Sequence, residues 1–348
     1  MPKVILGLSG GIDSTAALIL LLEHGFEPHC IMLRVYDGTS KCSAEKSARL
    51  AADITKRLGV PFELIDVRKE FREQVLDYFY VSYKKGETPN PCVQCNLKIK
   101  FRYLSEIRQE KGADFIATGH YAKMNLFNGK HLISCSRDIK KDQTYFLGFL
   151  GEEITRYLMF PLGSYLKEGM RKIISEAGLP LPEIAGESQD LCFTEDKDIP
   201  SFLESEYGFR VDEGDLVFGS KKLGVHKGYP FYTIGQRKRL SHNYHLPLYV
   251  REKDIESNTV YIDLKENTES QEFIFSNAVF HVDPGCLDGQ ELFVKLRHRG
   301  EKIKCGLRKE NGTYRISLEG NKAMITPGQA AVIYFKDMVC AAGWQKRS

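Results

Sequence analysis

No stretch of the sequence is apolar for long enough to cross a bilayer, and its first residues lack the charged and then apolar pattern of a signal peptide. Charge of one sign is also scarce, because 49 basic and 46 acidic side chains leave a net charge of only +3. These absences argue against a membrane partner and against a uniform polycation. We expect a cytoplasmic globular protein of two or three domains, at about 150 residues each. The sequence does not indicate an oligomeric state.

A secreted disulfide framework is also missing. The nine cysteines are odd in number and scattered along the chain, unlike the closely spaced even sets of secreted domains. We therefore expect reduced thiols, a few of which have a catalytic or metal-binding role.

The segment Ser9–Ser14, SGGIDS, follows the apolar run Val4–Leu8 and leads into the helical pattern Ala16–Glu23. A glycine-rich turn between a strand and a helix presents backbone N–H groups, hydroxyls and the positive helix end to a phosphate. The turn lacks the lysine of a Walker loop and the three spaced glycines of a dinucleotide fingerprint. Gly10 and Gly11 could also form only a tight turn. We favour a nucleotide site of another kind.

Residues 1 to about 120 alternate between strand and helix patterns. Strands are predicted at Val4–Leu8, His29–Leu33, Phe62–Val67 and Phe115–Thr118, and helices at Thr15–His24, Ser43–Leu58 and Glu70–Tyr83. This alternation predicts a parallel sheet covered by helices on both faces. Ligands bind beyond the carboxyl ends of the strands in such sheets, which is where Ser9–Ser14 lies.

After about residue 200 the helical periodicity fades and short strands between glycine-rich turns follow. They are predicted at Asp215–Phe218, Tyr249–Arg251, Val260–Leu264, Phe273–Val282, Glu291–Arg297, Tyr314–Leu318 and Ala330–Phe335. The pattern indicates a central β-rich module and a C-terminal barrel. We place the three domains at residues 1–200, 201–270 and 271–348.

Two segments of the C-terminal half, residues 219–240 and 295–309, are locally basic and contain aromatic or histidine side chains. This mixture suits a nucleic acid, whose phosphates attract the cations while its bases stack on the rings. A strand edge protected by lysines is the alternative. Because a nucleotide-binding loop is predicted in the same chain, we favour nucleic acid.

Cys92 and Cys95 form a C-x-x-C pair between a proline-rich turn and a predicted helix. Asn96 is a favourable N-cap residue, and it would place Cys95 at the positive end of that helix, near Lys98 and Arg102. Such a position lowers the pKa of a thiol, so Cys95 is the best candidate nucleophile. A structural zinc site is the alternative, but it needs a second ligand pair, which the sequence lacks.

Cys192 is the remaining candidate partner for Cys95. It lies in the polar segment 186–193, GESQDLCF, which prolines flank. A cysteine between leucine and phenylalanine is more often a small buried apolar residue than a reactive group. Judged by its two neighbours alone, Cys192 would be a buried apolar residue.

Six segments in order, SGGIDS, TPNPCVQCNLKIKF, ATGHYA, KKDQTYFL, GESQDLCF and YTIGQRKRL, resemble those of the tRNA-specific 2-thiouridylases. SGGIDS by itself resembles the loop of the ATP pyrophosphatases. The resemblance spans nearly the whole chain and implies an α/β fold, with a parallel-sheet ATP-pyrophosphatase domain, a central β-rich domain and a C-terminal β-barrel. It also implies ATP-dependent 2-thiolation of the wobble uridine of tRNA, by adenylation of the C2 oxygen and sulfur transfer from a cysteine persulfide.

The resemblance further implies roles for individual residues. Cys95 would be the nucleophile and Cys192 would carry the persulfide, supplied by a sulfur-donor protein, with a disulfide between the two at the end of the reaction. ATP would bind with Mg²⁺, which Asp13 helps hold. The ATP pocket would be lined by Gly7, Leu8, Ser9, Gly10, Gly11, Ile12, Asp13, Ser14, Leu33 and Gly119. Asn90, Pro91 and Cys92 would surround the target base, and Lys141, Asp142, Gln143, Arg297 and His298 would contact the tRNA. Without the resemblance, Lys141 and Asp142 fit an exposed ion pair equally well.

One position departs from the family pattern, because Cys92 stands where the family has an aspartate. A thiol does not reproduce the acid–base behaviour of a carboxylate. The substitution also creates a set of three thiols, Cys92, Cys95 and Cys192. These could ligate three irons of a [4Fe–4S] cluster and leave the fourth iron for sulfide. We keep the cluster as an alternative and favour the two-cysteine persulfide route.

Two rival functions share part of this pattern. Another enzyme with the same loop, such as an amide-forming ligase or a 4-thiouridine synthase, would also use ATP. A ligase would have no use for paired redox cysteines. A non-catalytic RNA-binding protein would bind tRNA without releasing pyrophosphate from ATP.

Overall fold

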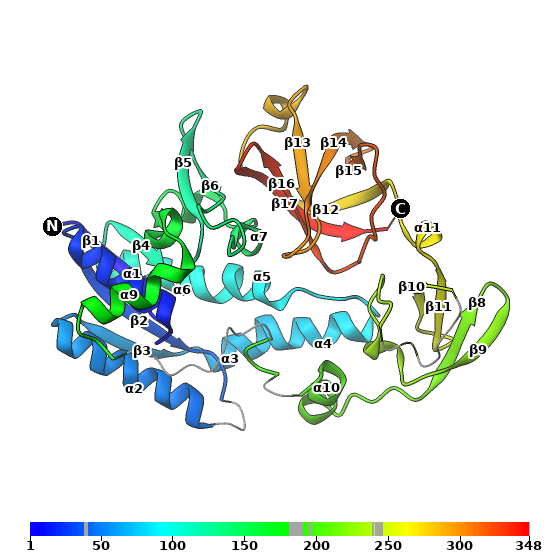
Figure 1. Ribbon diagram of the computed structural model, residues 1–348, viewed down its shortest axis with the longest axis horizontal. Helices are drawn as coiled ribbons and strands as arrows, with labels where there is room; N and C mark the ends of the chain where they lie inside the picture. The colour runs from blue at the N-terminus through cyan, green and yellow to red at the C-terminus, as the bar shows by residue number, and fades with distance from the viewer. Residues whose placement is uncertain (38–40, 181–190, 195–196, 239, 241–245, 348) are drawn as a thin grey trace.

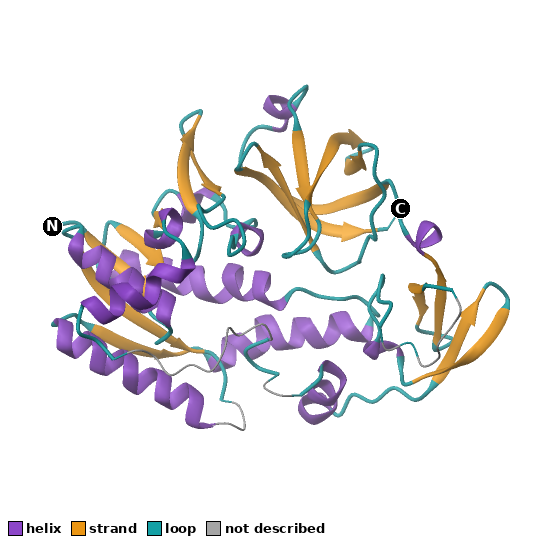
Figure 2. Ribbon diagram, viewed as in Figure 1, coloured by secondary structure: helices purple, strands orange, loops and turns teal. Residues whose placement is uncertain are grey.

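The computed structural model describes residues 1–37, 41–180, 191–194, 197–238, 240 and 246–347. These residues form a helix-covered parallel sheet, a small four-stranded sheet and a closed barrel (Figures 1 and 2). The predicted α/β class with two further β units is therefore confirmed. None of the helices in these ranges has the length and apolar character needed to cross a membrane.

The parallel sheet contains five strands in the order β3-β2-β1-β4-β7, and every neighbouring pair is parallel. Its strands are β1 (Lys3–Gly7), β2 (Glu27–Arg34), β3 (Phe62–Asp66), β4 (Phe115–Thr118) and β7 (Leu158–Met159). The register sets Leu6 of β1 opposite Cys30 of β2 and Ala117 of β4. The carboxyl ends of β1, β2 and β4 therefore meet at one edge, as expected for a ligand-binding sheet.

Helices cover both faces of this sheet because successive β1 side chains point to opposite sides. Val4 and Leu6 pack into a core with helices α1, α2 and α9, while Ile5 packs with Phe101 and Leu104 of α6. The helices are α1 (Ile12–Glu23), α2 (Lys41–Leu58), α6 (Phe101–Glu110) and α9 (Met170–Glu176).

Two long helical segments contain a π-helical turn each. The first is α3 (Arg68–Phe71), η1 (Arg72–Leu76) and α4 (Asp77–Lys84), and the second is α5 (Pro91–Cys95), η2 (Asn96–Lys100) and α6. The two π turns contact each other. Single π turns inside α-helices are frequent at functional sites, because they change which side chains share a face.

The central sheet has the order β10-β11-β8-β9, in which only β11 and β8 are parallel. Its strands are β8 (Gly214–Phe218), β9 (Lys221–His226), β10 (Leu248–Asp254) and β11 (Thr259–Leu264). It is connected to the first sheet through α10 (Ile199–Tyr207).

The barrel closes because β12 pairs with both β15 and β17. Its strands are β12 (Glu272–Phe280), β13 (Leu292–Lys295), β14 (Lys302–Glu310), β15 (Thr313–Leu318), β16 (Ala330–Phe335) and β17 (Met338–Lys346). The hairpin of β5 (Lys123–Phe127) and β6 (Lys130–Ser134) adds to β17 through the pair Ser134 and Met338, which attaches the barrel to the first domain.

Short helices connect these units. They are α7 (Thr144–Leu147), α8 (Glu152–Thr155) and α11 (Lys265–Thr268), with 3-10 turns η3 (Pro161–Ser164), η4 (Lys167–Gly169), η5 (Tyr229–Phe231) and η6 (Pro284–Leu287).

Candidate functional site

A cavity of about 700 Å³ lies at the carboxyl edge of the parallel sheet. Of the predicted ATP residues, those on its wall are Gly7, Leu8, Ser9, Asp13, Ser14, Leu33 and Gly119. Both predicted sulfur residues, Cys95 and Cys192, lie on the same wall. The structure thus brings the glycine-rich turn and the two thiols to one cavity, although nearly the whole first domain separates them in sequence.

The turn Ser9–Ser14 is held in a tight conformation by its own side chains. The Ser9 N–H donates to Ser14 Oγ at 3.1 Å, and Ser14 Oγ donates to the Gly11 carbonyl at 3.1 Å. Gly10 has φ +73°, and a Cβ there would lie 2.5 Å from the Ser47 carbonyl oxygen. Only glycine fits such a position without movement of the backbone. Gly10 therefore shapes the loop.

Gly11 and Ile12 start helix α1, and neither residue lines the cavity. Gly11 is its N-cap residue, and Ile12 packs partly into the sheet core. Gly119, which follows β4, approaches so closely that a Cβ on it would lie 2.8 Å from the Ser14 N atom. The wall at the helix start is thus built from backbone, which is the surface that anions bind.

Asp13 lies in the first turn of α1 and faces the cavity. Its carboxylate accepts a hydrogen bond from the Tyr121 hydroxyl at 3.0 Å and forms an ion pair with Lys167, whose Nζ is 2.6 Å from each oxygen. Mg²⁺ is commonly bound through one or two carboxylates together with substrate phosphates. Asp13 beside the phosphate-binding turn therefore fits the Mg²⁺ of an ATP complex.

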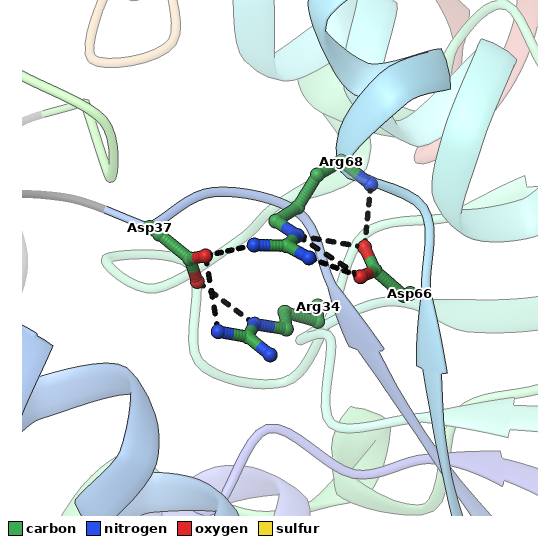
Figure 3. A network of polar contacts seen from close by, with 4 residues as sticks. All are labelled: Arg34, Asp37, Asp66 and Arg68. Carbon is green, nitrogen blue, oxygen red and sulfur yellow. Dashed lines mark hydrogen bonds and ion pairs between the residues drawn. The ribbon is translucent and has the colours of Figure 1, made fainter.

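A network of two arginines and two aspartates forms another part of the rim, where β2 and β3 end (Figure 3). Arg34 donates to Asp37 from Nε at 2.8 Å and from Nη2 at 3.0 Å. Arg68 bridges Asp37 and Asp66. Arg34 and Asp37 both line the cavity. The network therefore fixes the chain that follows Leu33.

The helix that carries Cys95 begins at Pro91, so the prediction of a start at Asn96 is wrong. Asn90 is the N-cap residue, and its side chain accepts a hydrogen bond from Val93 N at 3.2 Å. Proline is favourable at the first helical position because its missing N–H needs no partner there. Asn96 is buried instead, and its amide donates to the Phe146 carbonyl at 3.2 Å.

Cys95 therefore lies inside a continuous helix, and its predicted low pKa is also wrong. Burial raises the pKa of the Cys95 thiol, and Lys100 only partly opposes this effect. Lys98 is exposed and Arg102 is paired with Glu106 at 2.9 Å, so neither is the cation beside Cys95. The π turn explains why Lys100, and not Lys98 or Arg102, is the cation that acts on Cys95. A π-helical turn relates residue i to residue i+5, here Cys95 to Lys100.

Cys192 is exposed on the cavity wall, and the next residue anchors it. The ring of Phe193 is 3% exposed, with ring centroids 5.0 Å from Phe202 and 5.3 Å from Phe79. The protein around the cavity partly desolvates the thiol and, with the nearby Cys95, raises the pKa of Cys192 to about 12. The preceding motif residues 186–190 lie outside the described residues.

Cys92 lies one helical turn before Cys95, and its side chain is exposed. Desolvation, followed by the effect of Cys95, raises the pKa of the Cys92 thiol to about 11. Cys95 raises the pKa of Cys92, and Cys95 and Cys92 both raise the pKa of Cys192, so the three thiols lie near one another. Even so, no group of three or more His, Cys, Asp or Glu side chains in the described part of the chain is arranged to hold a metal ion.

The predicted tRNA residues 141–143 lie where the first domain meets the barrel. Asp142 is 5% exposed and accepts hydrogen bonds from Ser136 N at 3.0 Å and Thr144 Oγ1 at 2.6 Å, so the alternative of an exposed ion pair is wrong. Thr144 Oγ1 lies 2.9 Å from the hydroxyl of Tyr334 in the barrel. Gln143 faces the cavity, and its Oε1 accepts from Tyr121 N at 2.9 Å. Lys141 precedes them, half-buried.

Arg297 and His298 approach the same junction from the barrel. Arg297 is exposed and donates from Nη2 to Thr326 Oγ1 at 3.1 Å, while the His298 ring lies 4.3 Å from the Phe146 ring. Burial lowers the pKa of His298 to about 4, so its ring is neutral near pH 7. The structure therefore brings residues 141–143 and 297–298 to the two sides of one junction.

Sequence reasoning missed three residues that belong to this site. Lys100 lines the cavity and lowers the pKa of Cys95, Lys167 pairs with Asp13, and Gln329 of the barrel contacts the loop before Pro91. A lysine five positions after a cysteine is not a recognisable sequence motif, because this spacing brings the two residues together only where the helix contains a π turn. The other two contacts join residues far apart in sequence.

Three protein-family models match the chain in succession. They are described as a tRNA methyl transferase HUP domain over residues 2–196, a tRNA methyl transferase PRC-barrel domain over 201–263 and an aminomethyltransferase beta-barrel domain over 270–344.

Curated proteins match over nearly the full length. The tRNA-specific 2-thiouridylase MnmA of Leptospira biflexa is 36% identical over 343 residues, covering 95% of this chain and 90% of its own. The proteins of that name from Rickettsia typhi and Chloroflexus aurantiacus are 35% and 33% identical, each covering 100% of this chain and 99% of their own.

Among solved structures, the NMN synthetase of Francisella tularensis is 13% identical, with a TM-score of 0.34 over 60% of this chain and 78% of its own. A predicted subunit of tRNA methyltransferase from Methanocaldococcus jannaschii is 18% identical, with a TM-score of 0.30 over 51% of this chain and 75% of its own. Likenesses this distant do not bear on function.

Proposed function

The chain belongs to the tRNA-specific 2-thiouridylase family, and on that premise we propose how its residues form 2-thiouridine in tRNA. Family membership makes it a tRNA sulfurtransferase that uses ATP. The finer steps, the target at the wobble position and the residue roles below are our proposal.

One observation carries the proposal. The phosphate-binding turn with Ser9, the carboxylate of Asp13 and the thiols of Cys95 and Cys192 line the same cavity. An enzyme that activates a base with ATP and then replaces its oxygen by sulfur needs these groups within reach of one substrate atom. An amide-forming ligase needs only the phosphate-binding turn and the carboxylate, and it needs no thiols.

The first step is adenylation of the uridine. The tRNA docks across the junction of residues 141–143 and 297–298, and the target base leaves its stack to enter the cavity. Its C2 oxygen attacks the α-phosphorus of ATP, which forms the C2–O–AMP bond and breaks the bond to pyrophosphate. The N–H groups of the Ser9–Ser14 turn and the start of α1 stabilise the charge on the departing pyrophosphate. Mg²⁺, held by Asp13, supplies further charge neutralisation when bound.

The second step transfers sulfur. A persulfide donor protein transfers its outer sulfur to Cys192, whose exposed position on the cavity wall suits that exchange. The Cys95 thiolate then attacks the inner sulfur, a Cys95–Cys192 disulfide forms, and hydrosulfide leaves. Hydrosulfide attacks C2 and expels AMP, which leaves 2-thiouridine. The two electrons that reduce the sulfur come from the two cysteines. A thiol reductant must therefore reduce the Cys95–Cys192 disulfide before the next turnover.

The [4Fe–4S] alternative has less support than the persulfide route. The thiols of Cys92, Cys95 and Cys192 interact electrostatically, but in the described structure they do not form a metal-binding group. Cys95 and Cys192 line the cavity, whereas Cys92 does not. We therefore give Cys92 no metal-binding role and keep the role beside the target base that the family motif implies for it, together with Asn90 and Pro91.

Mass spectrometry of nucleosides from tRNA incubated with the protein, ATP and a persulfide source tests the proposal. We expect 2-thiouridine at the wobble position, and its loss in Cys95→Ser and Cys192→Ser. Cys286→Ser is the matched control, because Cys286 is exposed in the turn η6 of the barrel and does not line the cavity, and this variant should remain active. Thiolation at C4, or full activity of Cys95→Ser, would contradict the proposal.

A further inference from the structure

Lys167 forms an ion pair with Asp13, the acidic residue of the phosphate-binding turn. Lys167 Nζ lies 2.6 Å from both carboxylate oxygens, and the two side chains are 23% and 34% exposed. A divalent cation bound to Asp13 would lie close to this ammonium. Repulsion between the two cations would favour movement of the Lys167 side chain away from the metal.

Lys167 reaches Asp13 from a part of the chain that is distant from the turn in sequence. Lys167 begins the 3-10 turn η4, which follows β7 at the edge of the sheet, and its N–H donates to Asp138 Oδ2 at 3.0 Å. Helix α9 comes next and packs against α1, whose first turn carries Asp13. Lys167 is thus anchored at its backbone, and its flexible four-carbon stem can carry the ammonium from one partner to another.

The turn Ser9–Ser14 itself supplies no cation, although a leaving pyrophosphate carries several negative charges. The cations on the cavity wall are committed elsewhere. Arg34 forms two hydrogen bonds to Asp37, and Lys100 lies beside the thiol of Cys95. Lys167 is not on the cavity wall itself, but its ammonium contacts Asp13 in the first turn of α1, beside the turn that would hold the phosphates.

We propose that Lys167 is a pyrophosphate-binding residue that exchanges partners during the reaction. In the ligand-free site its ammonium neutralises Asp13. When Mg²⁺ and ATP bind, Asp13 turns to the metal and the ammonium of Lys167 turns to the β- and γ-phosphates, where it stabilises the departing pyrophosphate. No bond is made or broken at Lys167. The inference rests on the proposed use of ATP at this turn.

Isothermal titration of the whole protein with magnesium pyrophosphate and, separately, with AMP tests this inference. We expect Lys167→Met to weaken pyrophosphate binding by about tenfold or more, because a charge-assisted contact is lost, and to leave AMP binding unchanged. Lys167→Arg should recover part of the affinity. Lys172→Met is the matched control, since Lys172 lies on α9 and is 77% exposed, and it should behave as the unaltered protein.

A second measurement uses the unaltered protein and so does not depend on the folding of a variant. Acetylation with a lysine reagent, read by mass spectrometry, should decrease at Lys167 and not at Lys172 when magnesium pyrophosphate is added. Unchanged pyrophosphate affinity in Lys167→Met, equal loss of AMP binding, or unchanged acetylation of Lys167 would overturn the inference. If the unaltered protein bound neither ATP nor pyrophosphate, the proposed nucleotide site itself would fail.

Discussion

The Nε2 atom of Gln329 in the barrel donates a hydrogen bond at 2.8 Å to the backbone carbonyl of Thr88, which is 241 positions earlier in the chain. Thr88 N in turn donates to the Pro327 carbonyl at 2.9 Å. Gly328 between them has φ +90°, and a Cβ on it would lie 3.0 Å from Thr88. The barrel therefore holds the loop that leads into the helix with Cys92 and Cys95.

Replacement of Gln329 by alanine should impair the use of tRNA more than the binding of ATP. The variant leaves the Thr88 carbonyl without its partner, at a cost of about 1 kcal/mol, and loosens the loop around the target base. We expect KM for tRNA to rise several-fold while the affinity for ATP is unchanged. Gln290→Ala, at an exposed position of the barrel, is the control. Equal effects of both substitutions on KM would contradict the prediction.

Replacement of Phe193 by alanine should uncouple sulfur transfer from adenylation. Phe193 fixes Cys192 through rings of Phe71, Phe79 and Phe202, and its truncation should cost about 3–5 kcal/mol. We expect 2-thiouridine formation to fall while tRNA-dependent pyrophosphate release continues, and Phe193→Leu to recover part of the sulfur transfer.

The control for Phe193 is Phe273→Ala, which removes a fully buried ring from the barrel at a similar cost in stability. If both variants lose the two activities in parallel, the effect is one of stability alone and the positioning of Cys192 by Phe193 is refuted.

The position of Gly10 predicts a sharp difference between two glycine substitutions. Gly10 and Gly25 have φ of +73° and +76°, so alanine is strained at both, by about 1–2 kcal/mol. A Cβ on Gly10 would also lie 2.5 Å from the Ser47 carbonyl oxygen, whereas a Cβ on Gly25 would have no atom within 4 Å. Gly10→Ala should therefore lose ATP binding in a titration, and Gly25→Ala should keep it despite a lowered Tm.

The thiols should react slowly with alkylating agents near neutral pH. The pKa of Cys192 is raised from 9.0 to about 12, and that of Cys92 to about 11, so protonated thiols predominate well above pH 7. Since the thiolate is the reactive form, iodoacetamide labelling of Cys192 should rise by about tenfold per pH unit from pH 7 to 10. Residue-resolved mass spectrometry measures these rates. A plateau below pH 9 would show that the pKa is not raised.

Local features of the site could be predicted from the sequence. The turn Ser9–Ser14 lies between adjacent elements, and its conformation depends on its own glycines and hydroxyls, so residue types alone indicate it. The alternation of strands and helices likewise predicted the parallel sheet, and Phe115–Thr118 was predicted with the bounds that β4 has.

Features that depend on distant residues could not be predicted. Asn96 was predicted to be a helix N-cap, but its side-chain amide donates to the carbonyl of Phe146, 50 positions away. The helix begins at Pro91 instead. The pKa of Cys95 follows from burial among elements that fold around it, which residue spacing does not reveal. The β5–β6 hairpin and strands β7, β9, β14 and β17 were missed. β7 has only two residues, β9 and β14 are rich in lysine, and β17 contains alanines and a glycine, which have low strand propensity. These segments gain their stability from pairing in the sheet.

The central claim is that Cys95 and Cys192 act together beside the phosphate-binding turn. A single turnover with protein persulfurated at Cys192, ATP and tRNA, without a reductant, tests it most directly when peptides and nucleosides are both analysed by mass spectrometry. The account predicts a Cys95–Cys192 disulfide in an amount equal to the 2-thiouridine formed. Formation of 2-thiouridine with both thiols still reduced would contradict it.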